Sequence, residues 1–310
     1  MKYISIVTPC YNEEMNVEQL YTEIREVFAR IPGYRYEHLF IDNASNDKTV
    51  AILKTLAAKD RNVKIIVNAR NFGPIRSCAH GLFEARGDAV MLIVADLQDP
   101  PELIPEFIKK WEKGLKIVIG IKKKSMENKI MFSIRKLYYN IVQKTSEIDQ
   151  VKNFTGFGLY DKAFIEIIRK IDDPYPYFRG LITEIGFERA EIEYTQPRRK
   201  KGRTKTNFYS LWEIAMLGII SNSKMPIRLS SFIGFFISIA SLFVAILYFV
   251  YKILHWSEFS LGIAPLVIGL FFFGAVQLFC VGMIGEYVGA IYTQVKHRPL
   301  VIEKERVNFD

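Results

Sequence analysis

Two long stretches without a charged residue occupy the C-terminal third of the chain. The first has 20 residues, from Phe232 to Tyr251, and the second has 25, from Leu261 to Gly285. As a helix, each stretch is long enough to cross a hydrocarbon layer of about 30 Å. We therefore expect two transmembrane helices, over residues 229–254 and 261–292. Such a pair returns the chain to the side of the membrane from which it started.

The charges that flank these two stretches indicate how the chain is oriented. Lys224 and Arg228 precede the first, and Lys296 and Arg298 follow the second. Basic residues close to a span are retained on the cytoplasmic side. We therefore expect a multi-pass protein of the cell membrane, with the N-terminal part and the tail, residues 293–310, both in the cytoplasm. The three cysteines are far apart in the sequence and provide no disulfide framework, which suits a reducing compartment.

Residues 1–225 alternate short apolar runs with amphipathic ones, and half of the whole chain is apolar, which is enough for a buried core. The runs that predict strands are Ile4–Pro9, His38–Asp42, Val63–Ala69, Ala89–Ala95 and Lys116–Ile121. Helical spacing of apolar residues is found over Asn16–Ile31, Val50–Ala58 and Leu103–Lys113. This order predicts an α/β domain with a mostly parallel, doubly wound sheet, which binds ligands beyond the carboxyl ends of its strands.

Two polar turns follow the first two predicted strands. In the first, Asn12 is a residue type that caps helices, and spacing alone favours this structural role. In the second, Asp42 is placed to accept a ribose hydroxyl or a base N–H group. Ser45 and Asp47 fit an Asx-turn and the start of a helix instead. Both uses of the second turn are compatible, because different residues serve them.

A third polar turn, Asp96–Asp99, follows the nearly continuous apolar run Ala89–Ala95. A carboxylate that ends a buried strand is costly to desolvate without a partner. Mg²⁺ or Mn²⁺ is one such partner, because either ion takes oxygen ligands from one or two side chains and completes its shell with phosphates and water. Asp96 and the Gln98 carbonyl have the spacing for such ligands. The alternative is a plain turn, and we expect Asp99 to cap the helix that follows.

Two other stretches carry clustered basic residues, and a third carries a single arginine. The first, residues 125–144, mixes basic and apolar residues in the pattern of an amphipathic helix at an anionic membrane surface, although an ordinary solvated helix has the same pattern. The second, residues 196–228, has eight basic residues and one acidic residue. Its part Arg198–Lys205 suits a pyrophosphate or a lipid phosphate, and its position before a span argues against nucleic acid. The third, Arg70–Gly73, could steady a phosphate or the sheet edge.

Together these motifs resemble family 2 glycosyltransferases with a GT-A fold, and more narrowly the polyprenyl-phosphate glycosyltransferases, which include dolichyl-phosphate mannose synthases and bactoprenol glucosyltransferases. The matching motifs are P-x-Y-N-E at Pro9–Glu13, D-x-S-x-D at Asp42–Asp47 with one extra spacing residue, A-R-N-F-G at Ala69–Gly73, D-A-D-L-Q-D-P-P-E at Val94–Glu102, R-x-x-G-x-[ST]-K at Arg199–Lys205, and G-E-Y-x-G-x-x-Y with R-P at Gly285–Pro299. Six motifs in this order cover nearly the whole chain and are a specific signal.

The resemblance implies a metal-dependent, inverting hexosyltransferase. It would move a hexose, glucose from UDP-glucose being favoured, from a nucleotide sugar to undecaprenyl or dolichyl phosphate, and make a lipid-linked sugar donor for cell-surface glycosylation. The implied nucleotide site is Pro9, Tyr11, Asn12, Glu13, Asp42 and Asn71, and the implied metal site is Asp96 and Gln98. We assign the phosphates to Arg199 and Lys205, with Lys122 and Arg135 as further candidates. We expect Asp96, Arg199 and Lys205 to carry the catalysis.

Two departures from the family pattern bear on activity. Val94 stands where D-x-D has its first aspartate, and Gly156 and Gly158 stand where relatives carry Asp and Arg in G-D-F-R-L. If that Asp were a required base, the chain would be inactive. A phosphomonoester, however, has a second pKa of about 6 and attacks as a dianion without deprotonation. We hypothesise that the two glycines let the backbone approach the sugar closely.

Several alternatives stay open at this point. The donor could be GDP-mannose, as in dolichyl-phosphate mannose synthases, or the acceptor could be something other than a polyprenyl phosphate. The departures from the family pattern also allow a catalytically inactive membrane scaffold. Small residues in the second apolar stretch could pack helices within the hairpin or between the subunits of a homo-oligomer; they are Gly274, Ala275, Gly282 and Gly285.

Overall fold

The computed structural model describes residues 1–124, 151, 153–197, 225–254, 263–296 and 298–309. Its eight strands form one sheet in the order β7-β5-β6-β4-β1-β2-β3-β8. They are β1 (Lys2–Cys10), β2 (Tyr34–Asp42), β3 (Val63–Asn68), β4 (Ala89–Leu92), β5 (Ile117–Lys124), β6 (Phe154–Asp161), β7 (Arg189–Thr195) and β8 (Glu303–Val307). Among these, only β6 and β8 run antiparallel to their neighbours. The predicted α/β architecture with a mostly parallel sheet is confirmed.

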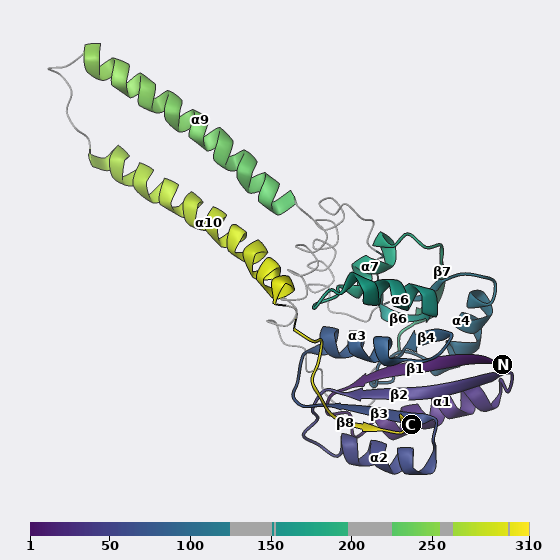
Figure 1. Ribbon diagram of the computed structural model, residues 1–310. Helices are drawn as coiled ribbons and strands as arrows, with labels where there is room; N and C mark the ends of the chain where they lie inside the picture. The colour runs from purple at the N-terminus through teal and green to yellow at the C-terminus, as the bar shows by residue number, and fades with distance from the viewer. Residues whose placement is uncertain (125–150, 152, 198–224, 255–262, 297, 310) are drawn as a thin grey trace.

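Helices cover both faces of this sheet (Figure 1). The helices on one face are α1 (Val17–Ala29), α2 (Thr49–Lys59) and α4 (Ile104–Trp111), which follows the 3₁₀ turn η1 (Pro101–Leu103). The helices on the other face are α3 (Pro74–Glu84), α6 (Lys162–Ile171) and α7 (Phe178–Glu184). Side chains of β1 contribute to the cores on both faces of the sheet. Ile4 and Ile6 pack with α1 and α4, whereas Val7 packs with α3. The side chains of a strand point alternately to the two faces, so one strand fills two cores.

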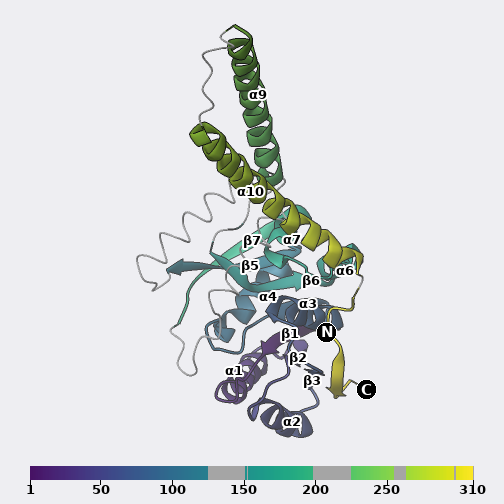
Figure 2. The same cartoon turned by 90° about the vertical axis from the view of Figure 1, so that its left-hand side faces the viewer.

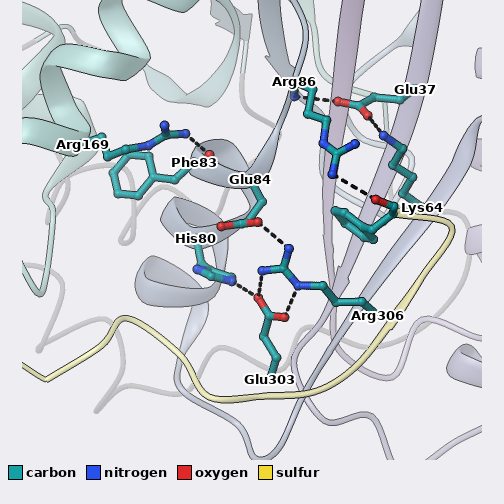
Figure 3. A network of polar contacts seen from close by, with 10 residues as sticks. Glu37, Lys64, His80, Phe83, Glu84, Arg86, Arg169, Glu303 and Arg306 are labelled. Carbon is teal, nitrogen blue, oxygen red and sulfur yellow. Dashed lines mark hydrogen bonds and ion pairs between the residues drawn. The ribbon is translucent and has the colours of Figure 1, made fainter.

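The C-terminal residues join the sheet of the N-terminal domain instead of forming only a tail. Strand β8 pairs antiparallel with β3 at the edge of the sheet, and Figure 3 shows the polar contacts that hold it. Arg306 pairs with Glu303 and, at 2.7 Å, with Glu84 at the end of α3. His80 Nε2 lies 2.5 Å from a Glu303 carboxylate oxygen. The chain therefore returns to its N-terminal domain after the apolar helices.

The two apolar stretches form long helices, α9 (Met225–Leu254) and α10 (Ile263–Val295). They project together from the sheet domain (Figures 1 and 2), and Ser230 Oγ lies 2.7 Å from Met283 Sδ between them. Within the described residues, one helix is long and apolar enough to cross a membrane, over Gly269–Val295. The second predicted span therefore stays a prediction. A Cβ built on Gly274, Gly282 or Gly285 meets no described atom within 4 Å. These glycines therefore do not provide a close contact between α10 and α9.

Candidate functional site

The carboxyl ends of the central parallel strands meet at one edge of the sheet. Cys10 pairs in register with Asp42, and Asp42 with Val67. Strand β4 ends beside β1, where the Ile93 N–H donates to the Val7 carbonyl at 3.0 Å. The turns after β1, β2 and β4, predicted from sequence as candidate site segments, therefore lie at the same edge.

The turns after β1 and β2 are tied to each other by hydrogen bonds. Asn12 N donates to Ser45 Oγ at 2.8 Å, and Asn46 N donates to Asn12 Oδ1 at 2.7 Å. Glu13 N donates to Thr49 Oγ1 at 2.8 Å. The predicted capping role of Asn12 is wrong, because α1 begins five residues later, at Val17, and Asn16 occupies its cap position. Asn12 instead links the two turns in a left-handed conformation, with φ of 53°.

Asp42 is fully buried at the end of β2. Its carboxylate accepts hydrogen bonds from Ser45 N at 2.9 Å and from Ser45 Oγ at 2.5 Å. Burial raises the pKa of this carboxyl, and the two Ser45 bonds oppose the rise. The predicted Asx-turn is confirmed at Asp47, whose Oδ1 accepts from Thr49 N at 3.0 Å. The predicted capping of α2 by Ser45 or Asp47 is wrong, because the residue at the cap position is Lys48. The nucleotide role of Asp42 stays a prediction.

Asn43, which the sequence analysis did not single out, connects the ends of β2 and β3. Its Oδ1 accepts from Phe72 N at 2.9 Å and from Asn68 Nδ2 at 3.2 Å. Its Nδ2 donates to Asn71 Oδ1 at 2.8 Å, and that oxygen also accepts from Gly73 N. Asn71, a predicted nucleotide ligand, therefore uses its amide oxygen to shape the turn before α3.

The turn after β4 folds back on itself and brings two carboxylates together; we call residues 94–99 the acidic loop. Gln98 N donates to Asp96 Oδ1 at 3.2 Å, and Val94 N donates to Asp99 Oδ2 at 3.2 Å. The predicted helix-capping role of Asp99 is wrong. This carboxylate is 2% exposed and instead accepts from Tyr194 OH of β7 at 3.1 Å. Asp99 therefore closes the acidic loop and ties it to a distant strand.

The electrostatics of the acidic loop favour a positively charged partner. The pKa of Asp99 is raised to about 6, because burial and the charge of Asp96 outweigh the lowering effect of the Val94 and Tyr194 bonds and of the charge of Lys122. Lys122 of β5, a predicted phosphate ligand, therefore lies within electrostatic range of the acidic loop. Two carboxylates at a half-buried edge repel each other unless a cation is near.

The oxygen donors of the acidic loop suit Mg²⁺ or Mn²⁺. In the described part of the chain, no group of three or more His, Cys, Asp or Glu side chains could hold a metal ion. Asp96 is half-buried, and Gln98 Nε2 donates to Pro197 O at 3.4 Å, which leaves the Gln98 amide oxygen as the ligand atom. One carboxylate and one amide oxygen fit an ion that takes its remaining ligands from phosphates and water.

The sequence of this domain matches the model of the family named Glycosyl transferase family 2 over residues 5–171. The chain belongs to glycosyl transferase family 2. The matched range runs from β1 through α6 and so includes the acidic loop and the turns after β1 and β2.

Relatives in this family match almost the whole chain. A Synechocystis protein named uncharacterized glycosyltransferase is 34% identical over 300 residues, which are 96% of this chain and 94% of that one. A bactoprenol glucosyl transferase of Shigella phage SfV is 33% identical over 305 residues, covering 97% of this chain and 98% of that protein. Among solved structures, mannosyl-3-phosphoglycerate synthase from Rubrobacter xylanophilus overlaps with a TM-score of 0.49 at 17% identity, over 69% of this chain and 71% of that one.

The two glycines that depart from the family pattern lie in β6. Gly156 has a φ of +107°, which an L-residue rarely adopts. A Cβ at Gly158 would lie 2.7 Å from the Tyr160 hydroxyl oxygen and 2.8 Å from the Val118 carbonyl oxygen. Tyr160 fills the space that a Cβ at Gly158 would need and donates to the Gly156 carbonyl at 2.7 Å, so Gly158 has a packing role in the sheet. The hypothesis that the two glycines let the backbone approach the sugar stays a prediction. Gly156→Ala would strain the backbone and does not test a sugar contact.

Three predicted site residues lie outside the described residues: Arg135, Arg199 and Lys205. Their roles stay predictions. The described chain does lead toward the acidic loop, because Pro197, two residues before Arg199, accepts the hydrogen bond from Gln98.

Proposed function

We propose that this protein transfers a glucosyl group from UDP-glucose to a polyprenyl phosphate, undecaprenyl phosphate being the favoured acceptor. The observation that carries the proposal is the meeting of Asp42, the acidic loop and Lys122 at one edge of a family 2 sheet. Full-length similarity to proteins named bactoprenol glucosyl transferase supports the choice of acceptor and sugar. The product is a lipid-linked glucose for cell-surface glycosylation.

The reaction needs little proton transfer. A phosphate oxygen of the lipid forms a bond to the anomeric carbon of glucose, and the bond from that carbon to the diphosphate oxygen breaks, with its electron pair leaving on UDP. Attack from the opposite face inverts the configuration through an oxocarbenium-like transition state. Because a phosphomonoester is largely a dianion near neutral pH, no base is required. The Gly156 and Gly158 replacements are therefore compatible with activity.

Each group at the sheet edge has a role in this proposal. Asp42 accepts a hydroxyl or N–H group of the nucleoside, beside the turn that Asn12 and Glu13 hold in place. Asp96 and Gln98 hold a divalent cation, which when bound stabilises the departing diphosphate as a Lewis acid. Asp99 and Tyr194 keep the acidic loop in shape. Lys122, Arg199 and Lys205 add positive charge where the phosphates lie, as fixed cationic groups do in phosphate sites.

Placement of the hairpin in a membrane is part of the proposal. Strand β7 precedes α9, strand β8 follows α10, and both belong to one sheet. A chain that leaves a sheet and returns to it crosses a bilayer an even number of times. If α10 spans the membrane, a second crossing is required, and we assign it to α9, which has 30 residues and is about 45 Å long. The sheet domain, both termini and the tail then share the cytoplasmic side.

The test uses membranes that contain the full chain, undecaprenyl phosphate and radiolabelled UDP-glucose. We expect label to enter the organic phase with the wild-type protein and to fall about 100- to 1,000-fold with Asp96→Asn, because one preorganised electrostatic group of the site is lost. Glu106→Gln is the matched control, since Glu106 is an exposed carboxylate on α4 away from the acidic loop. Transfer by Asp96→Asn at the wild-type rate would contradict the proposed metal site.

The same assay separates the alternatives. Label that enters the lipid from GDP-mannose but not from UDP-glucose would identify a mannosyltransferase. A scaffold would bind neither nucleotide sugar nor Mn²⁺ and would release no UDP. Its support is the loss of the Asp and Arg found in relatives at positions 156 and 158.

A further inference from the structure

Two arginines pack against one buried phenylalanine close to the C-terminal end of α10. The Arg70 guanidinium carbon is 4.1 Å from the centroid of the Phe72 ring, and the Arg76 guanidinium carbon is 5.5 Å from it. Arg76 Nη2 also donates to the Pro299 carbonyl at 2.5 Å, which brings Arg298 into the same group. Residues from the turn before α3, from α3 itself and from the segment after α10 thus place three positive charges together.

Within the described residues, these charges have no carboxylate that pairs with them. None of Arg70, Arg76 and Arg298 forms an ion pair anywhere in the part of the chain that the structure describes. Arg76 Nε is buried and has no hydrogen-bond partner. Burial lowers the pKa of Arg76, and the charges of Arg70 and Arg298 lower it further. The three like charges repel one another, and a bound anion would offset this repulsion.

The arginine group begins where the apolar part of α10 ends. The membrane-compatible stretch is Gly269–Val295, and Arg298 follows it by three residues. On the last turn of α10, the Lys296 ammonium lies 4.2 Å from the centroid of the Tyr292 ring. Tyrosines and lysines of this kind mark the level of lipid head groups at the end of a span. If α10 is in a bilayer, the three arginines lie at the depth of the lipid phosphates.

We propose that Arg70, Arg76 and Arg298 bind the phosphate of an anionic lipid head group, at a site separate from the acidic loop. The planar guanidinium fork binds phosphate oxygens in pairs, which suits arginine better than lysine. Arg76 is held by the Pro299 carbonyl, whereas Arg70 and Arg298 are exposed and able to reach a ligand. The first helical turn of α3, after Gly73, adds partial positive charge in the same place.

The proposal shares with the proposed function only the placement of α10 in a bilayer, and its test measures binding without turnover. Full-length protein in a neutral detergent is titrated with dihexanoyl phosphatidic acid, and binding is followed by calorimetry. We expect saturable binding, weakened about fivefold by Arg70→Gln or Arg298→Gln and about 25-fold by the double variant, since each basic residue at an anionic surface contributes an increment of this size. Arg30→Gln, at the exposed end of α1, is the matched control and binds as the wild type does.

Two further probes identify the source of the phosphate. Dihexanoyl phosphatidylcholine, which carries no net charge, should bind at least tenfold more weakly; equal binding would overturn the proposal. Inorganic phosphate that binds as tightly as the lipid would also overturn it, because a soluble anion would then be the ligand. The double variant Arg70→Lys/Arg298→Lys keeps both charges and should retain more binding than the glutamine pair. Equal binding by wild type and by both double variants contradicts the site.

Discussion

Gly158 is a residue whose missing side chain the fold requires. Replacing it by alanine would place Cβ 2.7 Å from the Tyr160 hydroxyl oxygen and 2.8 Å from the Val118 carbonyl oxygen. A backbone carbonyl in the centre of a sheet cannot move aside cheaply, so we expect Gly158→Ala to destabilise the protein by about 1–3 kcal/mol. This corresponds to a fall in thermal midpoint of about 2–10 °C, measured on detergent-solubilised protein.

Gly33→Ala is the matched control for this prediction. Gly33 has no atom within 4 Å of a built Cβ and no positive φ, so its replacement should leave the midpoint nearly unchanged. If Gly158→Ala melted at the wild-type temperature, the contact between Gly158, Tyr160 and Val118 would not be as described.

At the residue scale, the sequence predicted where site residues stand better than what they contact. The positions of Asp42 and Asp96 at the sheet edge could be predicted because Asp42 ends one run of apolar residues and Asp96 follows another. The role of Asp99 was missed because its partner Tyr194 is 95 positions away in the chain, and local spacing shows only neighbours. Asn43 was missed for the same reason, since its contacts lie 25 to 29 residues on. Arg199 and Lys205 remain predictions.

At the element scale, the buried strands β1 to β5 were predicted well, whereas α3, β6, α6, α7, β7 and β8 were not predicted. The runs that became β1 to β5 are nearly continuous apolar segments, which a parallel sheet requires. Helix α3 was missed because Gly81 interrupts it. That glycine is needed there, since a Cβ would lie 2.9 Å from Val7 Cγ1 on the sheet. Strand β8 was missed because its sequence, E-K-E-R-V, has the charged character of an edge strand.

Strand β8 protects the edge of the sheet, and its removal should be costly. All six residues of β3 are buried, and β8 supplies its outer partner. Deletion of residues 303–310 would expose an apolar edge with unpaired backbone groups, which templates aggregation. We expect a lower thermal midpoint and increased light scattering with protein concentration. A truncated protein that stays monodisperse at the wild-type midpoint would contradict this role.

Glu305→Gln provides the control for the deletion. It removes only the exposed pair between Lys54 and Glu305, whose nitrogen and oxygen are 2.7 Å apart. Exposed ion pairs contribute about 0–1 kcal/mol, so this variant should melt close to the wild type. A large effect of Glu305→Gln would mean that the charges, and not the strand pairing, hold the edge.

At the scale of the whole molecule, the apolar hairpin is anchored to the sheet domain at its C-terminal end. After α10, Arg76 holds the Pro299 carbonyl, and Ala69 N donates to the Ile302 carbonyl at 2.8 Å. Ala69 begins the turn that carries Asn71, which Asn43 joins to the end of β2. A few hydrogen bonds therefore connect the end of α10 to the proposed nucleotide site. If α10 spans a bilayer as proposed, this segment would set both the orientation of the sheet domain against the bilayer and the position of that site.

The membrane placement can be tested with single cysteines in a background lacking Cys10, Cys78 and Cys280. Residues 255–262 link two helices whose large apolar side chains are exposed, such as Phe235 at 60% and Phe271 at 71%, as expected for lipid contact. We expect Ser257→Cys to react with a membrane-impermeant maleimide in intact cells. Glu305→Cys, in β8, should react only after permeabilisation, because the sheet holds β7 and β8 on one side. If both cysteines reacted only after permeabilisation, the hairpin would not cross the membrane. If Glu305→Cys reacted in intact cells, the orientation would be opposite to the one that the flanking basic residues predict.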